Sequence, residues 1–188
     1  MRCFLALPFS NQFKDYLLQT QYDIMNEDVY KVKWVEKQNF HLTLFFWQDI
    51  DEELIEKIHG ILENLFTDIP PLTIRTRYLG FFPEKGEPKV IWVGLEKSRQ
   101  LDDLINLIRK CFLSNLIPLE QKSFNPHITL GRLKAIYKIN KVKELPLSTD
   151  RLNNPFSEKI HEVVLYQSSL QKNGPVYTII KRYGLNNL

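Results

Sequence analysis

Cysteine and long apolar runs are scarce in this sequence, and each scarcity excludes a class of protein. The 188 residues include two cysteines, Cys3 and Cys111, which make neither a disulfide framework nor a zinc motif. No apolar run approaches the roughly 20 residues that span a bilayer, and the apolar stretch at the N-terminus is too short for a secretory signal. We therefore expect a cytoplasmic protein with reduced thiols and no membrane association.

An excess of charge of one sign is also missing. The chain carries 25 Lys and Arg against 22 Asp and Glu, a formal net charge of +3. Proteins that coat nucleic acid usually cluster basic charge more heavily, so the balance tolerates an anionic ligand without requiring one. With 44% hydrophobic residues and no linker or low-complexity segment, the sequence predicts a single two-lobed domain over residues 1–188.

Short predicted strands alternate with amphipathic helical stripes along the chain. Helices are expected after Ser10, after a capping box of Asp49 and Glu52, and over residues 101–112. Residues 134–159 are mixed, and their prolines favour loop with at most a short helix. Strands are expected at residues 3–7, 33–35, 41–47, 72–78, 90–93, 127–133, 163–170 and 176–183.

The order strand, helix, strand occurs twice, which predicts a repeated architecture. We expect an α+β fold that is bilobal and pseudo-symmetric, with two antiparallel-rich sheets flanked by helices around a central cleft. The strongest form of the repeat is a tetrapeptide, because His41-Leu42-Thr43-Leu44 recurs as His127-Ile128-Thr129-Leu130.

Each tetrapeptide presents an imidazole and a hydroxyl to one side of its strand. Side chains alternate between the faces of a strand, so His41 shares a face with Thr43, and His127 shares one with Thr129. Two copies in a pseudo-symmetric fold could bring two imidazoles to one cleft. Unperturbed histidine titrates near pH 6.5, so one ring can accept a proton while the other donates one. The pattern predicts paired acid–base catalysis, and a duplicated structural motif without chemistry is the alternative.

Matches to a known family surround both motifs and run nearly end to end. They are Arg2–Leu7, Trp34-Val35, Asn39-Phe40, Phe82-Pro83, Pro88–Gly94, Phe124-x-Pro126, Gly131-Arg132, Leu165-Tyr166-x-Ser168-x-Leu170 and Gly174-Pro175-x-Tyr177. On these residues and the two His-x-Thr-x motifs, the chain resembles the two-histidine phosphoesterase superfamily. Within it, the sequence is most similar to the RNA 2′,3′-cyclic phosphodiesterases, also called 2′-5′ RNA ligases.

The resemblance implies a reaction and its residues. Members of the family open a terminal 2′,3′-cyclic phosphate on RNA to leave a 2′-phosphate, so RNA 3′ ends are the implied partner. It implies His127 as proton acceptor and His41 as proton donor, although the residues alone do not orient the pair. Thr43 and Thr129 would donate hydrogen bonds to the nonbridging phosphate oxygens, where charge grows in the transition state.

Arg132 follows the second motif where the family has a phosphate-facing arginine. Strict alternation puts Arg132 on the opposite face from His127. The role therefore requires a bulge or a twist at Gly131, and a surface salt bridge is the alternative.

Aromatic residues near the motifs bear on base recognition. Where the family often continues with Phe-Leu-Gly after the first motif, this chain reads Phe46-Trp47-Gln48, which changes the local turn. Strict alternation puts Phe45 on the motif face. With Tyr166 and Tyr177, it is a candidate for stacking on the terminal base, and packing in the core is the alternative.

No metal, cofactor or obligate protein partner is implied. The motifs supply two histidines without an adjacent Asp or Glu, whereas catalytic zinc usually has three protein ligands. His59 and His161 lie in no motif and are assigned to structure or solvent.

Two other functions stay open. One is a related phosphoesterase that acts on 2′-5′ linkages, including ligation as the reverse reaction, or on small cyclic nucleotides. The other is a non-catalytic module that binds RNA ends.

Overall fold

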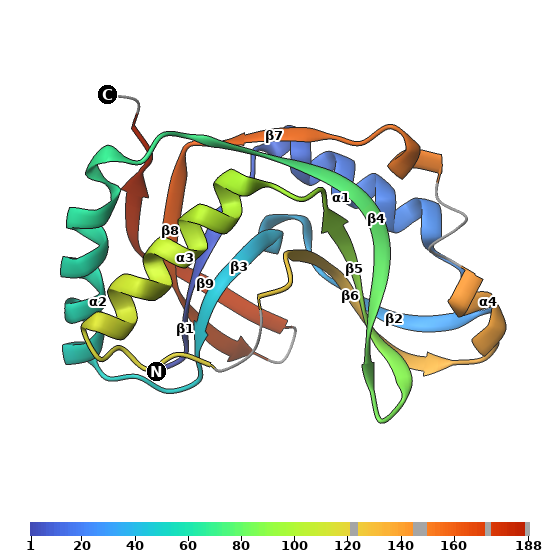
Figure 1. Cartoon of the computed structure of the whole chain (residues 1–188). Coiled ribbons are helices and arrows are strands. Elements are labelled where there is room, and N and C mark those ends of the chain that lie inside the picture. Colours follow the sequence, from blue (N-terminus) through green and yellow to red (C-terminus); the bar gives the residue numbers. More distant parts are fainter. Residues whose placement is uncertain (121–123, 145–149, 172–173, 187–188) are drawn as a thin grey trace.

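Two antiparallel sheets form the framework of the molecule. The computed structural model describes residues 1–120, 124–144, 150–171 and 174–186 (Figure 1). Its strands are β1 (Cys3–Pro8), β2 (Tyr30–Trp34), β3 (His41–Trp47), β4 (Leu72–Glu84), β5 (Glu87–Leu95), β6 (His127–Ile136), β7 (Ser157–Ile160), β8 (Glu162–Gln171) and β9 (Gly174–Gly184). One sheet has the order β3-β1-β8-β9 and the other β2-β6-β5-β4-β7, with every pair antiparallel.

Helices cover the sheets on the sides away from the motifs. They are α1 (Asn11–Ile24), α2 (Glu52–Leu65) and α3 (Arg99–Ser114), whereas the short α4 (Ile139–Glu144) follows β6 beyond the end of the five-stranded sheet (Figure 1). Figure 1 shows α2 and α3 side by side next to the four-stranded sheet and α1 along the five-stranded sheet. The predicted α+β class with two antiparallel sheets is confirmed, and each sheet contains one of the two motif strands, β3 or β6.

The helix caps follow the sequence in one case and depart from it in the other. Ser10 caps α1 as predicted, because its hydroxyl accepts a hydrogen bond from the Phe13 amide at 3.1 Å. The capping box at Asp49 is wrong. Asp51 is the cap of α2 and accepts from the Leu54 amide at 2.8 Å, while Asp49 binds the amino group of Met1 at 2.9 Å.

Strand β7 overlaps the end of residues 134–159, for which the sequence predicts loop with at most a short helix, and this part of the prediction is wrong. It pairs with the beginning of β4, with Leu72 opposite Ile160. Buried Glu158 of this strand accepts hydrogen bonds from the amide and hydroxyl of Ser10 at 2.7 and 3.0 Å. These contacts join residues far apart in the sequence, so local patterns carry no signal for them.

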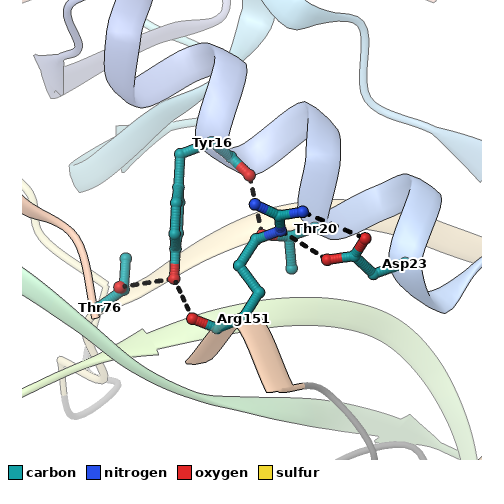
Figure 2. A network of polar contacts seen from close by, with 5 residues as sticks. All are labelled: Tyr16, Thr20, Asp23, Thr76 and Arg151. Atoms are coloured by element: carbon teal, nitrogen blue, oxygen red, sulfur yellow. Dashed lines mark hydrogen bonds and ion pairs between the residues drawn. The ribbon is translucent and has the colours of Figure 1, made fainter. Parts of the chain in front are cut away.

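A polar network fixes the chain just before β7 (Figure 2). The Tyr16 hydroxyl on α1 accepts from Thr76 Oγ1 at 3.2 Å and donates to the Arg151 carbonyl at 3.3 Å. The guanidinium of Arg151 returns to α1 and pairs with both carboxylate oxygens of Asp23, at 2.5 and 3.3 Å. Thr76 Oγ1 in turn accepts from the Phe156 amide at 2.9 Å. The network therefore ties together α1, β4 and the segment that enters β7.

The apolar residues of both motifs anchor the two strands in the core. Leu42, Ile128 and Leu130 have no exposed surface, and Leu44 is 5% exposed. Burial of such side chains contributes on the order of 1.5–3 kcal/mol each, so the strands that carry the motif residues are firmly held. Within the described ranges, no helix has the length and apolar character needed to cross a membrane.

Candidate active site

Both motifs open onto one cleft of about 710 Å³ between the two sheets. The four-stranded sheet, which we call the first lobe, contributes His41 and Thr43 from β3, and the five-stranded sheet, the second lobe, contributes His127 and Thr129 from β6. The two motif strands lie against each other across this cleft. Other lining residues include Arg2, Phe4, Trp34, Phe46, Arg132, Ser168 and Tyr177. The sequence prediction that the repeat brings two imidazoles to one cleft is therefore matched by the structure.

The same β-bulge follows the threonine in both motifs. Against β1, Thr43 pairs with Ala6 and Phe45 with Leu5, so Leu44 is the extra residue. Against β5, Thr129 pairs with Trp92 and Gly131 with Ile91, so Leu130 is the extra residue. A bulge of this kind reverses the alternation of all later side chains. The pseudo-symmetry of the two lobes thus extends from the motif residues to an irregularity of the backbone.

The bulges decide which residues after the motifs face the cleft. Arg132 lines the cleft, because the bulge just before it supplies the irregularity that its predicted role required at Gly131. In the first lobe the corresponding position is Phe46, which also lines the cleft. The placement of Phe45 on the motif face is wrong. It is 7% exposed and packs edge-on against Phe112 of α3, because the bulge turns it to the core.

The ring of His41 is held at both nitrogens. Its Nδ1 lies 2.8 Å from the Asn39 carbonyl oxygen, and its Nε2 lies 3.0 Å from Thr43 Oγ1. Because a carbonyl only accepts, Nδ1 carries the proton and Nε2 of the neutral ring accepts from the Thr43 hydroxyl. The ring also packs against Phe4 and Tyr177, with centroid distances of 4.7 and 5.3 Å.

His127 is fixed in the same way at Nδ1 but not at Nε2. Its Nδ1 donates to the Asn125 carbonyl at 2.7 Å. The ring stands perpendicular to Phe82 at 4.6 Å and lies 6.2 Å from Trp92. Among the residues that the structure describes, Nε2 of His127 has no hydrogen-bond partner, so its lone pair is available to a ligand in the cleft.

The carbonyl partners reveal a longer repeat than the tetrapeptide. Both histidines follow an asparagine two residues earlier, so the repeated unit is Asn-x-His-x-Thr-Leu. The Asn39 side chain also donates to the Pro175 carbonyl at 3.2 Å, which ties the first motif to the start of β9. Comparing the two motifs over a wider window would have found this signal in the sequence.

The surroundings of the two imidazoles lower their basicity. The pKa of His41 falls from its ordinary 6.5 to about 4, chiefly because the ring is buried; the hydrogen bond to the Asn39 carbonyl opposes this fall, and the nearby His127 and Lys14 add to it. Burial also lowers the pKa of His127, again opposed by a carbonyl, that of Asn125. Both rings are therefore neutral at pH 7 in the free cleft, and an anion between them would favour their protonation.

One buried residue supports the second bulge and was missed in the sequence. Gln21 of α1 is 3% exposed, and its amide nitrogen donates to the carbonyls of Leu130 at 2.8 Å and Val35 at 2.9 Å. The Val35 amide also donates to Leu130 at 2.8 Å. These bonds satisfy the carbonyl of the bulged residue and thereby fix the backbone that turns Arg132 to the cleft. A single polar residue in a helical stripe carries no sequence signal for such a role.

The other two histidines lie outside the cleft. His59 of α2 lies 3.3 Å from the buried Tyr183 hydroxyl and 3.9 Å from a Glu63 oxygen, and His161 is exposed between β7 and β8. Tyr166 packs against Phe4 at 5.1 Å, with its centroid 6.5 Å from that of His41. Across the described part of the chain, no cluster of three His, Cys, Asp or Glu side chains is arranged to hold a metal ion.

The fold defines the class of the protein. The structure superposes on TT0787 of Thermus thermophilus with a TM-score of 0.81 at 27% identity, covering 100% of this chain and 99% of that one. E. coli LigT complexed with 3′-AMP gives a TM-score of 0.76 at 21% identity, covering 99% and 98%. The chain thus has the fold of the LigT-type phosphoesterases.

Sequence comparison then gives the family. The model of the 2′-5′ RNA ligase superfamily matches residues 19–171. An RNA 2′,3′-cyclic phosphodiesterase of Methanocaldococcus jannaschii is 32% identical over 97% of this chain and 100% of its own length. The chain belongs to the 2′-5′ RNA ligase superfamily, and the family assignment made from the sequence is confirmed.

Proposed function

We propose that this protein is an enzyme that hydrolyses the 2′,3′-cyclic phosphate at RNA 3′ ends to a 2′-phosphate. The observation that carries the proposal is the meeting of two His-x-Thr motifs in one cleft, each ring fixed by a backbone carbonyl. The relatives named RNA 2′,3′-cyclic phosphodiesterase support the choice of substrate. We further propose that the protein acts in the cytoplasm, where its two free thiols stay reduced.

His127 acts as the proton acceptor and His41 as the proton donor. Water attacks phosphorus and gives its proton to Nε2 of His127 as the new P–O bond forms. The bond from phosphorus to the 3′ oxygen breaks, and that oxygen takes the proton from Nε2 of His41. The free lone pair on His127 Nε2 supports this orientation, because His41 Nε2 is engaged by Thr43.

The bound phosphate favours the protonated form of His41, which the proton donor requires. With a pKa near 4, the free ring holds no proton on Nε2 at neutral pH. A phosphodiester anion in the cleft raises this pKa, since an opposite charge at short range favours the imidazolium. When Nε2 is protonated, it donates to Thr43 Oγ1 and releases the hydroxyl hydrogen of Thr43 toward the phosphate.

Two threonines and an arginine hold the phosphate. The hydroxyls of Thr43 and Thr129 enter the cleft from opposite lobes and donate to the nonbridging oxygens. Arg132, turned inward by the bulge, adds a positive charge on the side of His127. Side chains thus supply both proton transfers and the charge stabilisation, so the proposed reaction is independent of metal ions and should persist in chelator.

An end-group assay tests the function. The purified protein should convert an RNA oligonucleotide ending in a 2′,3′-cyclic phosphate to the 2′-phosphate, and the double variant His41→Ala/His127→Ala should not. His161→Ala removes an exposed histidine and is the matched control with wild-type turnover. A 3′-phosphate product, or equal turnover by the double variant, contradicts the proposal. Joining of RNA ends through a 2′-5′ linkage in the same assay would identify the reverse reaction of the same site.

A further inference from the structure

Arg2 is a second cleft arginine to which the reaction above assigns no role. It lies immediately before β1, and its carbonyl accepts from the Ser168 amide at 2.9 Å, which fixes it beside β8. Its side chain lines the same cleft as the two histidines. The guanidinium carbon lies 5.4 Å from the centroid of the Phe46 ring, a cation–π contact.

The guanidinium of Arg2 forms no ion pair with the residues that the structure describes. Its Nε atom is buried and has no hydrogen-bond partner among the described residues. A buried donor without a partner is costly, and a cation costs more, so such a group in a cleft indicates an anionic ligand.

Arg2 and Arg132 occupy related places in the two lobes. Arg132 is the first residue after the second bulge that faces the cleft, and Phe46 is its counterpart after the first bulge. In the first lobe the cation therefore comes from the neighbouring strand and lies on that phenylalanine. Both arginines act on the Tyr177 hydroxyl, since their charges lower its pKa against the larger opposing effect of burial.

The position of Phe46 separates Arg2 from the scissile phosphate. Thr43 lies beside His41, and the next side chain of β3 that faces the cleft is that of Phe46. Strand β1 runs antiparallel to β3, with Pro8 opposite His41 and Phe4 opposite Phe46. The backbone of Arg2, two residues before Phe4, therefore lies further from His41 along the strands than Phe46 does, and its guanidinium rests on the Phe46 ring. An RNA end carries its next phosphate one nucleotide toward the 5′ end, which is the anion available at that distance.

We infer that Arg2, held on Phe46, binds the phosphate on the 5′ side of the terminal nucleotide. The inference rests on the proposed function and narrows its substrate class to RNA ends that carry this phosphate. Arginine binds phosphate through two parallel hydrogen bonds, and the unpartnered Nε is one of the donors that can face it. Mononucleotide 2′,3′-cyclic phosphates with a free 5′ hydroxyl should accordingly be poor substrates.

The test compares two substrates that differ in a single phosphate. These are uridine 2′,3′-cyclic phosphate with a free 5′ hydroxyl and the same compound with a 5′-phosphate. In the wild-type protein the 5′-phosphate should raise kcat/KM by about ten-fold or more, the size expected of a charge-assisted contact. Arg2→Met should bring the ratio of the two kcat/KM values close to one, and Arg2→Lys should give an intermediate ratio because the charge remains but the paired donors are lost.

Arg99→Met is the matched control, since the Arg99 side chain is 94% exposed on α3 and its loss changes the net charge equally. This variant should keep the wild-type ratio. A wild-type ratio near one overturns the inference. Equal losses on both substrates in Arg2→Met overturn it too, because they would place Arg2 on the scissile phosphate or in a structural role. Thermal unfolding of each variant shows whether the protein remains folded, and Arg2→Lys serves if Arg2→Met does not.

A binding measurement separates this inference from the proposed function. Uridine 5′-monophosphate carries the 5′ phosphate and no reacting group, and calorimetry can follow its binding without turnover. Its Kd should rise about ten-fold in Arg2→Met and stay unchanged in Arg99→Met. A wild-type protein that binds this probe in an Arg2-dependent way but turns over neither cyclic substrate supports the subsite and contradicts the function. Binding that is indifferent to Arg2 contradicts the subsite alone.

Discussion

The two lobes carry the same Asn-x-His-x-Thr-Leu unit and the same bulge, but they treat their imidazoles differently. His41 is enclosed by Phe4 and Tyr177 and bonded to Thr43, and its pKa falls to about 4. His127 meets Phe82 and keeps Nε2 free of protein partners within the described residues. A duplicated backbone thus fixes two rings alike, and in the reaction proposed above the different side chains around them set which ring gives a proton and which takes one.

The largest expected effect on kcat/KM comes from removing either of the two imidazoles. His41→Ala and His127→Ala should each lower kcat/KM by about 10³-fold on a cyclic-phosphate RNA end, because each removes one proton transfer. The double variant should be little worse than either single one, since the two groups act in one step. Turnover within a factor of about ten of wild type in either folded variant contradicts the pairing, on the same magnitudes for acid–base catalysis.

The next effect sharpens the difference between the two hydroxyls. Thr43→Val and Thr129→Val should each lower kcat by about 10²-fold, as expected when a donor to a developing negative charge is lost. Thr43→Val should also shift the pH dependence of kcat/KM, because Thr43 contacts His41 Nε2. Thr129→Val should leave the pH profile in place. Equal shifts of the pH profile in both variants would contradict this expectation, because they would show that the contact between Thr43 and His41 Nε2 does not influence the pKa of His41.

A smaller effect follows from the support of the second bulge. Gln21→Leu should lower kcat/KM by about ten-fold, because it removes one of the two hydrogen bonds to the Leu130 carbonyl and loosens the bulge that turns Arg132 to the cleft. In a protein that already carries Arg132→Ala, Gln21→Leu should lower kcat/KM hardly any further. If Gln21→Leu acted through a general loss of structure, it would lower kcat/KM equally with and without Arg132. Gln12→Leu, at an exposed position on the same helix, is the matched control.

The smallest effect concerns protonation of the free protein. NMR titration should give His41 a pKa near 4, and His127 a pKa below 6.5. Because both values lie below that of the unfolded chain, the unfolded state binds more protons as the pH falls through 6.5 toward 4. The free energy of unfolding should therefore fall over this window and be flat above it with respect to these groups. His41→Asn should reduce the slope, and an unchanged slope contradicts the assignment.

The sequence predicted the parts of this molecule that local patterns encode. The repeat identified His41, Thr43, His127 and Thr129, and alternation put each pair on one face. Alternation failed at Phe45, because a bulge depends on the partner strand as well as on the residues in it. For Arg132 the sequence showed that a bulge was required but not that one existed.

Contacts between distant segments account for the remaining differences. Strand β7 forms against β4 through Ile160 and Leu72, and Glu158 completes the cap of α1, so neither is visible in residues 134–159 alone. Gln21 acts on Leu130 across more than half of the chain. Such residues become recognisable only after the fold has brought their partners together.

A sulfur substitution tests the assignment of the two histidines most directly. In a substrate with sulfur in place of the 3′ oxygen, the leaving thiolate needs no proton, so the proton donor becomes dispensable while the acceptor does not. Turnover of this substrate by His41→Ala should return to within about ten-fold of wild type, whereas His127→Ala should stay about 10³-fold below it. Rescue of His127→Ala instead, or of neither variant, would contradict the account.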